Sequence, residues 1–287
     1  MNKVKSYEEN YLELCQKILD EGVWVENERT GVRCKTIIGH TLEYTGEVPL
    51  LTTKQSFPVS AVAEIIGYLR GYDNAQQFED IGTKSWWVNS EETQAWKDSP
   101  LRKGNGDLGR VYGVVARDFN GVDLVYQVYD HLCKGIDDRG ETITFWNPSD
   151  FDKGCLRPCM RNHTFSILGD KLYMESESRS VDVGCGLNFN SIQCHFLLEL
   201  MCHICGYEFG KVRHNLINAH IYEPHIEGIK EQLSRTPKKL NAEMRINGWV
   251  EYMQDVTECH THARDYFTLT GYGKDAHLGK IPFELIA

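Results

Sequence analysis

The chain has 287 residues and a mass of 33.0 kDa, which is enough to bury a large core as one domain. Its net charge of −10 and pI of about 5.6 disfavour nucleic acid and anionic membranes as partners, and no cluster of lysine and arginine interrupts that charge. No apolar run is typical of a signal peptide or a membrane span, so we expect a cytoplasmic protein, or one of the host cytoplasm if its source is viral.

The first half of the chain contains two well-marked helices. Ser6 and Glu9 have the spacing of a capping box, which predicts a helix that ends at Gly22. A second helix is predicted over residues 58–71, because it begins with a proline and its apolar residues repeat at helical spacing. Glu64 lies within this apolar helix, where a carboxylate needs a specific reason to be present.

The rest of the chain alternates between helices and strands. The predicted elements are a helix over 124–135, a hairpin over 163–178 that turns at Gly169-Asp170, a helix over 190–206, a strand over 212–222 and a helix from Pro224. Residues 88–104 and 236–262 are polar and weakly patterned, so we expect long loops there. No linker divides the sequence, and we expect a single domain over residues 1–287.

A cysteine with polar partners is the most informative feature of the sequence. Arg157-Pro158-Cys159 precedes the hairpin, and the second strand of the hairpin leads to Arg179-Ser180-Val181-Asp182 and then to Gly186-Leu187-Asn188-Phe189-Asn190. A guanidinium beside a thiol lowers the pKa of the thiol, and its paired N–H groups can also bind the oxygens of a phosphate. A serine hydroxyl adds a phosphate donor, and a carboxamide can read the edge of a pyrimidine. This segment therefore predicts a nucleotide pocket built around a cysteine.

These motifs, with Asn218-Ala219-His220-Ile221-Tyr222, resemble the thymidylate synthase superfamily, which includes the pyrimidine nucleotide hydroxymethylases. Further blocks in the family's order are Arg29-Thr30-Gly31 as a phosphate loop, Pro49 to Lys54 as a first core strand, Glu64 to Asn74 as the catalytic glutamate helix, and Asn105 to Gly113. The resemblance implies an α+β fold, with a large bent mixed β-sheet packed with helices. It also implies a homodimer formed through that sheet.

The resemblance implies folate-dependent one-carbon chemistry without a metal. The unit carried by 5,10-methylenetetrahydrofolate is transferred to carbon 5 of a pyrimidine nucleoside monophosphate, after Cys159 adds to carbon 6. Glu64 corresponds to the residue that promotes opening of the folate donor and handles protons through water. Tyr112 corresponds to a tyrosine that helps to remove the proton from carbon 5, although an ordinary core aromatic is an equal alternative. Asn190 is the base-reading position.

The resemblance also assigns binding roles. The phosphate would be bound by Arg29, Arg179, Ser180 and the partner subunit's Arg139, and the sugar by His220 and Tyr222. The folate side would include Asp182, Trp86, Leu156 and Ala287, with Trp87 as a competitor for the role of Trp86. The family usually has a second arginine where this chain has Gly140, which puts the arrangement at the phosphate in doubt.

Base and product are predicted from single positions. Asparagine at position 190 goes with uracil, so we expect dUMP rather than dCMP. Met160, Asn188 and Ile217-Asn218 replace residues that are nearly constant in thymidylate synthases, and these changes, with Gly140, favour admission of water and a 5-hydroxymethylase. The first alternative is a thymidylate synthase that converts dUMP to dTMP. The second alternative is a hydroxymethylase that acts on dCMP or CMP.

Two other classes of protein stay open. Cys202-His203-Ile204-Cys205 and Cys259-His260-Thr261-His262 contain enough ligands for a zinc site. A nonenzymatic nucleotide-binding module is the other alternative, and it would not need the thiol of Cys159. The ten cysteines are scattered over a chain without a signal peptide, so we expect them to be reduced.

Overall fold

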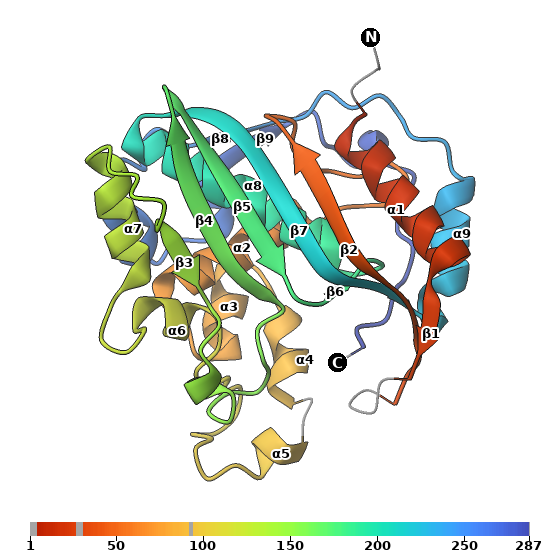
Figure 1. Cartoon of the computed structure of the whole chain (residues 1–287), viewed down its shortest axis with the longest axis horizontal. Helices are drawn as coiled ribbons and strands as arrows, with labels where there is room; N and C mark the ends of the chain where they lie inside the picture. Colours follow the sequence, from red (N-terminus) through yellow and green to blue (C-terminus); the bar gives the residue numbers. More distant parts are fainter. Residues whose placement is uncertain (1–4, 27–30, 92–93, 287) are drawn as a thin grey trace.

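The computed structural model describes residues 5–26, 31–91 and 94–286. The predicted site residues Arg29 and Ala287 lie outside these ranges. Within them, helices and one large mixed β-sheet are layered together (Figure 1), as the α+β prediction requires. No helix in the described ranges is long and apolar enough to cross a membrane.

The central layer is a mixed β-sheet with the strand order β1-β2-β7-β5-β4-β3, and β6 also pairs with β7. β5 and β6 run parallel to β7, whereas the other pairs are antiparallel. The strands are β1 (Val23–Val25), β2 (Cys34–Tyr44), β3 (Thr142–Thr144), β4 (Met160–Leu168), β5 (Lys171–Ser178), β6 (Val181–Asp182) and β7 (Glu208–Tyr222).

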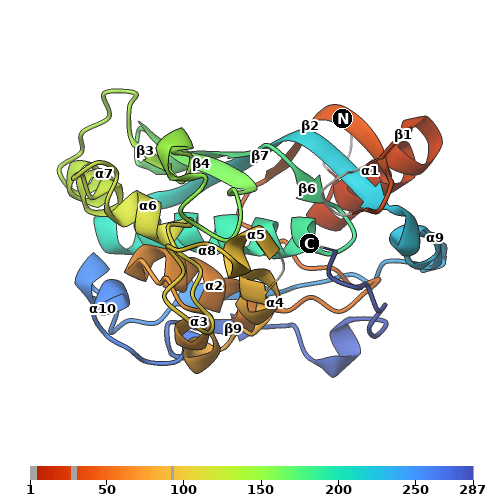
Figure 2. The ribbon, with the colours of Figure 1, turned by 90° about the horizontal axis from the view of Figure 1, so that it is seen from below.

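Helices cover one face of this sheet. Figure 2 shows α8 (Gly186–Cys205) lying directly against the strands, with α2 (Pro58–Arg70) packed on the other side of α8. Both helices are apolar almost all round, because each is enclosed between layers. The other helices are α1 (Tyr7–Glu21), α3 (Ala75–Ile81), α4 (Ser85–Glu91), α5 (Gln94–Lys97), α6 (Gly113–Arg117), α7 (Leu124–Cys133), α9 (Ile226–Ser234) and α10 (Met253–Thr257), and a second sheet pairs β8 (Glu243–Ile246) with β9 (Phe267–Thr270).

The opposite face of the sheet carries polar side chains. On β5, buried residues alternate with half-buried ones, as expected when one face is covered. The outward residues form a ladder in which Arg213 binds Glu43 and Glu175, and Asn215 binds Thr41 and Glu175. This face is available to a second subunit. A homodimer with the β-sheet as its interface, which the resemblance implies, stays a prediction.

Most of the predicted elements are confirmed. Ser6 and Glu9 form both hydrogen bonds of the capping box of α1, and Gly22 is its C-cap. α2 ends at Gly71 in the left-handed conformation, which glycine adopts without strain. The predicted hairpin corresponds to β4 and β5, and α8 and β7 each begin four residues before the predicted starts at Asn190 and Val212.

Three predictions need correction. Residues 49–54 do not form a strand; instead Glu8 of α1 accepts hydrogen bonds from the backbone and hydroxyl groups of Thr52 and Thr53. The first long strand is β2, which sequence analysis missed because its outward face is polar. The predicted loops 88–104 and 236–262 contain part of α4 and all of α5, β8 and α10, elements too short to give a periodic pattern.

Three buried histidines make stability depend on pH. Burial lowers the pKa of His163 and His195 to about 3 and that of His214 to about 4. In the unfolded chain they take up protons near pH 6.5, so their contribution to stability is present above that pH and is lost as the pH falls. We expect each to lower the free energy of unfolding by about 1.3 kcal/mol between pH 7 and pH 5.5.

Urea unfolding at both pH values, at one protein concentration, measures this effect. Neither ring nitrogen of His163 has a hydrogen-bond partner, so His163→Leu is a suitable variant. It should show about one third less pH dependence than the unchanged chain if the three residues contribute equally. An unchanged pH dependence would assign the effect to other groups.

Candidate active site

The pairing of β4 with β5 brings Cys159 and Arg179 together. Cys159 immediately precedes β4 and Arg179 immediately follows β5, and the backbone N–H of Arg179 donates to the carbonyl oxygen of Cys159 at 2.9 Å. The guanidinium of Arg179 donates to the carbonyl oxygens of Pro158, at 2.8 Å, and Arg157, at 2.9 Å. The arginine therefore holds the cysteine loop, a role in addition to the phosphate binding predicted from the sequence. Ser180, the next residue, is half-buried.

Glu64 is buried in α2 and accepts three side-chain hydrogen bonds. The Tyr68 hydroxyl donates at 2.7 Å, the Ser85 hydroxyl at 2.7 Å and the Gln193 amide at 3.0 Å. Burial raises the pKa of Glu64, and the three hydrogen bonds offset part of that rise because they stabilise the ionised form. A carboxyl group in this environment is suited to gaining and losing a proton.

Tyr112 connects the glutamate to the cysteine. Its ring stacks on Tyr68, with centroids 4.5 Å apart and planes 5° from parallel, and its hydroxyl accepts a hydrogen bond from the backbone N–H of Cys159 at 2.7 Å. Tyr112 has a φ of +34°, a conformation that costs about 1–3 kcal/mol outside glycine. Its contacts hold the hydroxyl beside the cysteine despite that cost.

Trp86 and not Trp87 packs against this tyrosine. The rings of Trp86 and Tyr112 lie 5.8 Å apart, edge to face, and Trp86 is almost fully buried. The indole N–H of Trp87 donates to Glu79 at 2.6 Å. Leu156 is half-buried and packs against the same core. Of the two competitors, Trp86 therefore has the position expected from the resemblance.

Asn190 lies one turn into α8 and is linked to Glu64. Its side-chain amide donates to the Gln193 carbonyl oxygen at 2.9 Å, and Gln193 in turn donates to Glu64. The two residues are three apart on the helix and so share one face. Hydrogen bonds and ring stacking thus connect Asn190 to Cys159 through Gln193, Glu64 and the tyrosine pair.

β7 and β6 place the predicted sugar and folate residues side by side. Asp182 of β6 pairs in register with His220 of β7. The His220 and Tyr222 rings lie 4.9 Å apart, edge to face, on the same side of the strand. The Asn218 side-chain oxygen is 3.0 Å from Nδ1 of His220, a distance at which the two groups share a hydrogen bond.

Arg139 does not reach this cluster within one subunit. It lies exposed in the loop between α7 and β3, with a φ of +71°. The side chain of Asp137 fixes this loop to Ile167 near the far end of β4, through a 2.8 Å hydrogen bond. Because β4 begins just after Cys159, about 25 Å of extended strand at ~3.3 Å per residue separates that end from the cysteine.

The carboxyl-terminal segment lies beside Asp182 and its neighbours, the predicted folate side of the cluster. The Glu284 carbonyl oxygen is 2.8 Å from Nε2 of His225 and 3.7 Å from Sγ of Cys185. Lys54 is buried beneath Phe283, with Nζ 4.6 Å from the ring centre, and donates to the carbonyl oxygen of Gly184. Asp182, which is predicted to bind folate, is 3.5 Å from the His225 ring.

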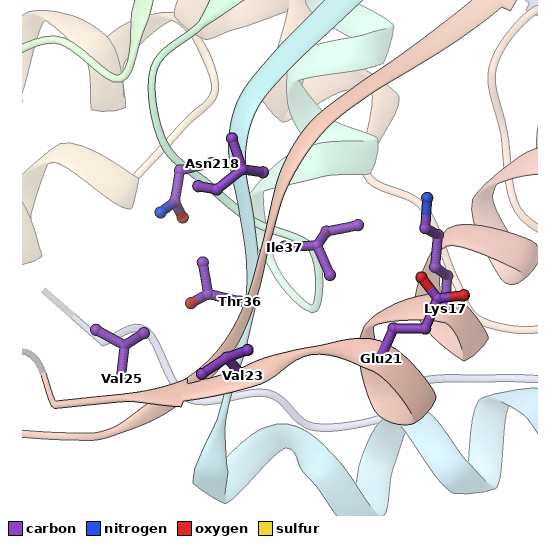
Figure 3. A pocket seen from close by; sticks show the side chains of 8 residues that line it. Lys17, Glu21, Val23, Val25, Thr36, Ile37 and Asn218 are labelled. Atoms are coloured by element: carbon purple, nitrogen blue, oxygen red, sulfur yellow. The ribbon is translucent and has the colours of Figure 1, made fainter.

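A separate hollow of about 440 Å³ lies at the edge of the sheet. It is lined by Lys17 and Glu21 of α1 together with residues of β1, β2 and β7 (Figure 3). Its lining includes Asn218 but neither Cys159 nor Glu64, so this hollow is distinct from the catalytic cluster.

The zinc alternative is wrong for the proposed ligand set. Cys202 is buried within α8, Cys205 contacts Cys133 at an Sγ–Sγ distance of 3.1 Å, and His260 lies against Tyr72. Among residues in the described ranges, the one group of three potential ligands within 4.8 Å of one another is Asp182, Cys185 and His225. The cysteines in the described ranges are all free thiols.

The comparison with known families decides to which protein family the chain belongs. The family model "Thymidylate synthase" matches residues 9–284. The chain belongs to the thymidylate synthase family. It is therefore an enzyme that uses methylenetetrahydrofolate for one-carbon transfer to carbon 5 of a pyrimidine nucleotide.

Individual thymidylate synthases are similar to almost the whole chain. Those of Idiomarina loihiensis and Pseudoalteromonas translucida are each 49% identical over 271 residues, which is 91% of this chain and 95% of the relative. That of Aliivibrio fischeri is 48% identical over 284 residues, or 96% of this chain and 99% of the relative. These relatives favour the alternative product prediction, thymidylate, over the preferred prediction of a hydroxymethylase.

Sequence analysis missed three side chains that hold Glu64. Tyr68 lies four residues after Glu64 on α2, so helical spacing could have identified it. Gln193 could have been noticed as a polar residue within an apolar helix. Ser85 belongs to α4, and no sequence pattern connects it with α2.

Proposed function

We propose that this member of the thymidylate synthase family converts dUMP to dTMP and releases dihydrofolate. The observation that carries the proposal is the unbroken set of contacts from Asn190 through Gln193, Glu64 and the stacked tyrosines to Cys159. It joins the groups needed to read the base, move a proton and add to the ring. The relatives named thymidylate synthase support the methyl product.

The proposed chemistry begins at Cys159. Its thiolate adds to carbon 6 of the uracil, which makes carbon 5 nucleophilic enough to attack the methylene carbon of the folate. Arg179 favours the thiolate by its charge while its remaining N–H groups bind a phosphate oxygen. Tyr112 helps to remove the proton from carbon 5, and Glu64 supplies a proton through water as the folate leaves the transferred carbon. Hydride transfer from the tetrahydrofolate to the methylene group left on carbon 5 then gives the methyl group and dihydrofolate, and the bond between the Cys159 sulfur and carbon 6 breaks to release dTMP.

The binding groups are proposed around this centre. Ser180, Arg29 and the partner subunit's Arg139 complete the phosphate site with Arg179, and His220 and Tyr222 hold the sugar hydroxyl. On the folate side we propose Asp182, Trp86, Leu156 and the carboxyl-terminal Ala287.

Three of the residues that favoured a hydroxymethylase have local structural roles. The Asn188 side chain is buried and bonded to the Ser56 hydroxyl and the Pro49 carbonyl oxygen, so it joins the amino-terminal loop to α8. Met160 is buried in the core. Asn218 lies in hydrogen-bonding distance of His220. Local packing and hydrogen bonding therefore account for these three residues without admission of water, which supports the proposal of a methyl product.

Analysis of the products tests the proposal. Enzyme incubated with methylenetetrahydrofolate and dUMP should produce dihydrofolate, seen by its absorbance, and a nucleotide heavier by one CH₂ group. A nucleotide heavier by CH₂O, without dihydrofolate, would establish the hydroxymethylase instead. Parallel reactions with dCMP, UMP and CMP determine the base and sugar.

A subunit-mixing experiment tests the proposed dimer. Arg139→Ala and Cys159→Ser dimers should each have little activity, because every site in them lacks one needed group. In a mixed dimer, one site combines an intact Cys159 with an intact Arg139 of the partner subunit. Random exchange should therefore restore about a quarter of the unmodified activity, since half of the dimers are mixed and each has one intact site.

Measurement of activity against mixing time, after brief mild denaturation, follows this recovery. Arg245→Ala is a matched control, because Arg245 is an exposed arginine on β8, in the second sheet, that pairs with Glu243, and its dimers should stay active. If the two inactive variants never restore activity although they exchange subunits, Arg139 does not act across the interface.

A further inference from the structure

We propose that Gln193 is the positioning residue that makes Asn190 select uracil over cytosine, an inference that rests on the proposed function. The side chain of Gln193 is fully buried in α8. Its amide nitrogen donates to Oε1 of Glu64 at 3.0 Å, and its carbonyl oxygen accepts from Nδ2 of Asn190 at 2.9 Å. Both ends of one carboxamide are therefore used between two residues of the site.

The orientation of Gln193 is set by Glu64. An ionised carboxylate only accepts hydrogen bonds, so the NH₂ group of Gln193 must face Glu64 and its oxygen must face Asn190. Glu64 is itself fixed by Tyr68 and Ser85, which donate to its two oxygens at 2.7 Å. The carboxamide of Gln193 has no second orientation that satisfies these groups.

The fixed oxygen of Gln193 in turn fixes Asn190. The NH₂ group of Asn190 must face Gln193, which leaves its oxygen and one remaining N–H to meet the base. Uracil offers an N3–H donor and an O4 acceptor, and this pair matches. Cytosine offers an N3 acceptor and an amino donor. To match them, the side-chain amide of Asn190 would have to flip, which would place its oxygen beside the oxygen of Gln193. A buried pair of facing acceptors is strongly unfavourable.

Two variants separate the two hydrogen bonds of Gln193. Gln193→Met has a similar length and removes both bonds, so Asn190 becomes free to turn. Gln193→Glu keeps an acceptor for Asn190 but sets a second carboxyl group against Glu64, so that these two groups must share a proton. Gln232→Met is the matched control, because Gln232 is also a fully buried glutamine on a helix, and its amide donates to Thr53 instead.

The measurement is equilibrium binding of dUMP and dCMP to each folded homodimer, together with kcat/KM for dUMP against pH. We expect Gln193→Met to lower the ratio of dUMP to dCMP affinity at least tenfold, while Gln193→Glu and Gln232→Met keep it within about threefold. Gln193→Met should also shift the pH profile of kcat/KM assigned to Glu64 to higher pH, since the lost hydrogen bond favoured the ionised form. A merely structural role would not move either quantity.

An unchanged affinity ratio in folded Gln193→Met would overturn the inference. If that variant does not fold, loss of the base preference in Gln193→Glu, which keeps the acceptor, would overturn it equally. The base preference of the unmodified enzyme distinguishes failure of this inference from failure of the proposed function. Preference of the unmodified enzyme for dCMP would refute the proposed function, whereas a dUMP preference that survives in Gln193→Met refutes only the role of Gln193.

Discussion

Serine in place of Cys159 is expected to reduce turnover of dUMP by about 10⁴-fold or more, because a hydroxyl is a far weaker nucleophile than a thiolate at neutral pH. Two of the contacts that hold this residue are made by its backbone, to the Tyr112 hydroxyl and the Arg179 N–H, and the substitution leaves both in place. Binding of dUMP should therefore change only a few-fold. Steady-state assays and equilibrium dialysis measure the two quantities.

Release of tritium from carbon 5 of dUMP gives a more sensitive measure, because it follows addition of the thiolate without requiring complete turnover. Cys133→Ser is the control, since Cys133 is an exposed cysteine on α7, and it should behave as the unmodified enzyme. A Cys159→Ser enzyme with more than a few per cent of normal activity would contradict covalent catalysis by this residue.

Glutamine in place of Glu64 is expected to reduce kcat by about 10²- to 10⁴-fold, the usual range for loss of a positioned acid or base. Gln has nearly the same shape, and its oxygen can still accept from Tyr68, so the fold should be kept. Burial raises the pKa of Glu64. The dependence of kcat/KM on pH should therefore include a limb above the usual pH range of a carboxyl group, and Glu64→Gln should lack it.

Glu199→Gln is the matched control, because burial also raises the pKa of Glu199, which lies on α8 outside the described cluster. Its activity and pH profile should equal those of the unmodified enzyme. A Glu64→Gln enzyme that keeps the same limb would show that another group titrates there and that Glu64 has a different role.

The sequence was a good guide wherever one local signal decided the outcome. The capping box of Ser6 and Glu9, the glycine that ends α2 and the turn at Gly169-Asp170 each depend on a few neighbouring residues. The same is true of Cys159 and Arg179, since a hairpin between them necessarily brings its two ends together. Such features need no knowledge of distant parts of the chain.

The sequence was a poor guide where side chains from distant elements meet. Asn188 looks like a polar change beside the nucleotide, but Ser56 and Pro49 turn it toward the loop before α2. Asn188 was one of the departures on which the preference for a hydroxymethylase rested, and these contacts weaken its weight as a residue beside the reacting carbon. Residues two apart on a helix face different directions.

Residues 49–54 illustrate a second kind of failure. Their apolar beginning fits a core strand, yet Glu8 accepts the N–H groups of Thr52 and Thr53, which are then unavailable to a neighbouring strand. A buried carboxylate on another helix, invisible to any window of sequence, decides the local conformation. Gln193 belongs to the same class, since its importance depends on partners from two elements.

The position of residues 283–286 has a practical consequence for work with this protein. His225 and Cys185 contact the carbonyl oxygen of Glu284, and Phe283 covers Lys54 beside Gly184, which follows Asp182 of β6. A purification tag or fluorescent fusion attached behind this segment would compete with the chain for the space over the folate side. Recombinant protein carrying such an extension is therefore a poor reference for kinetic work, and a cleavable extension is the better choice.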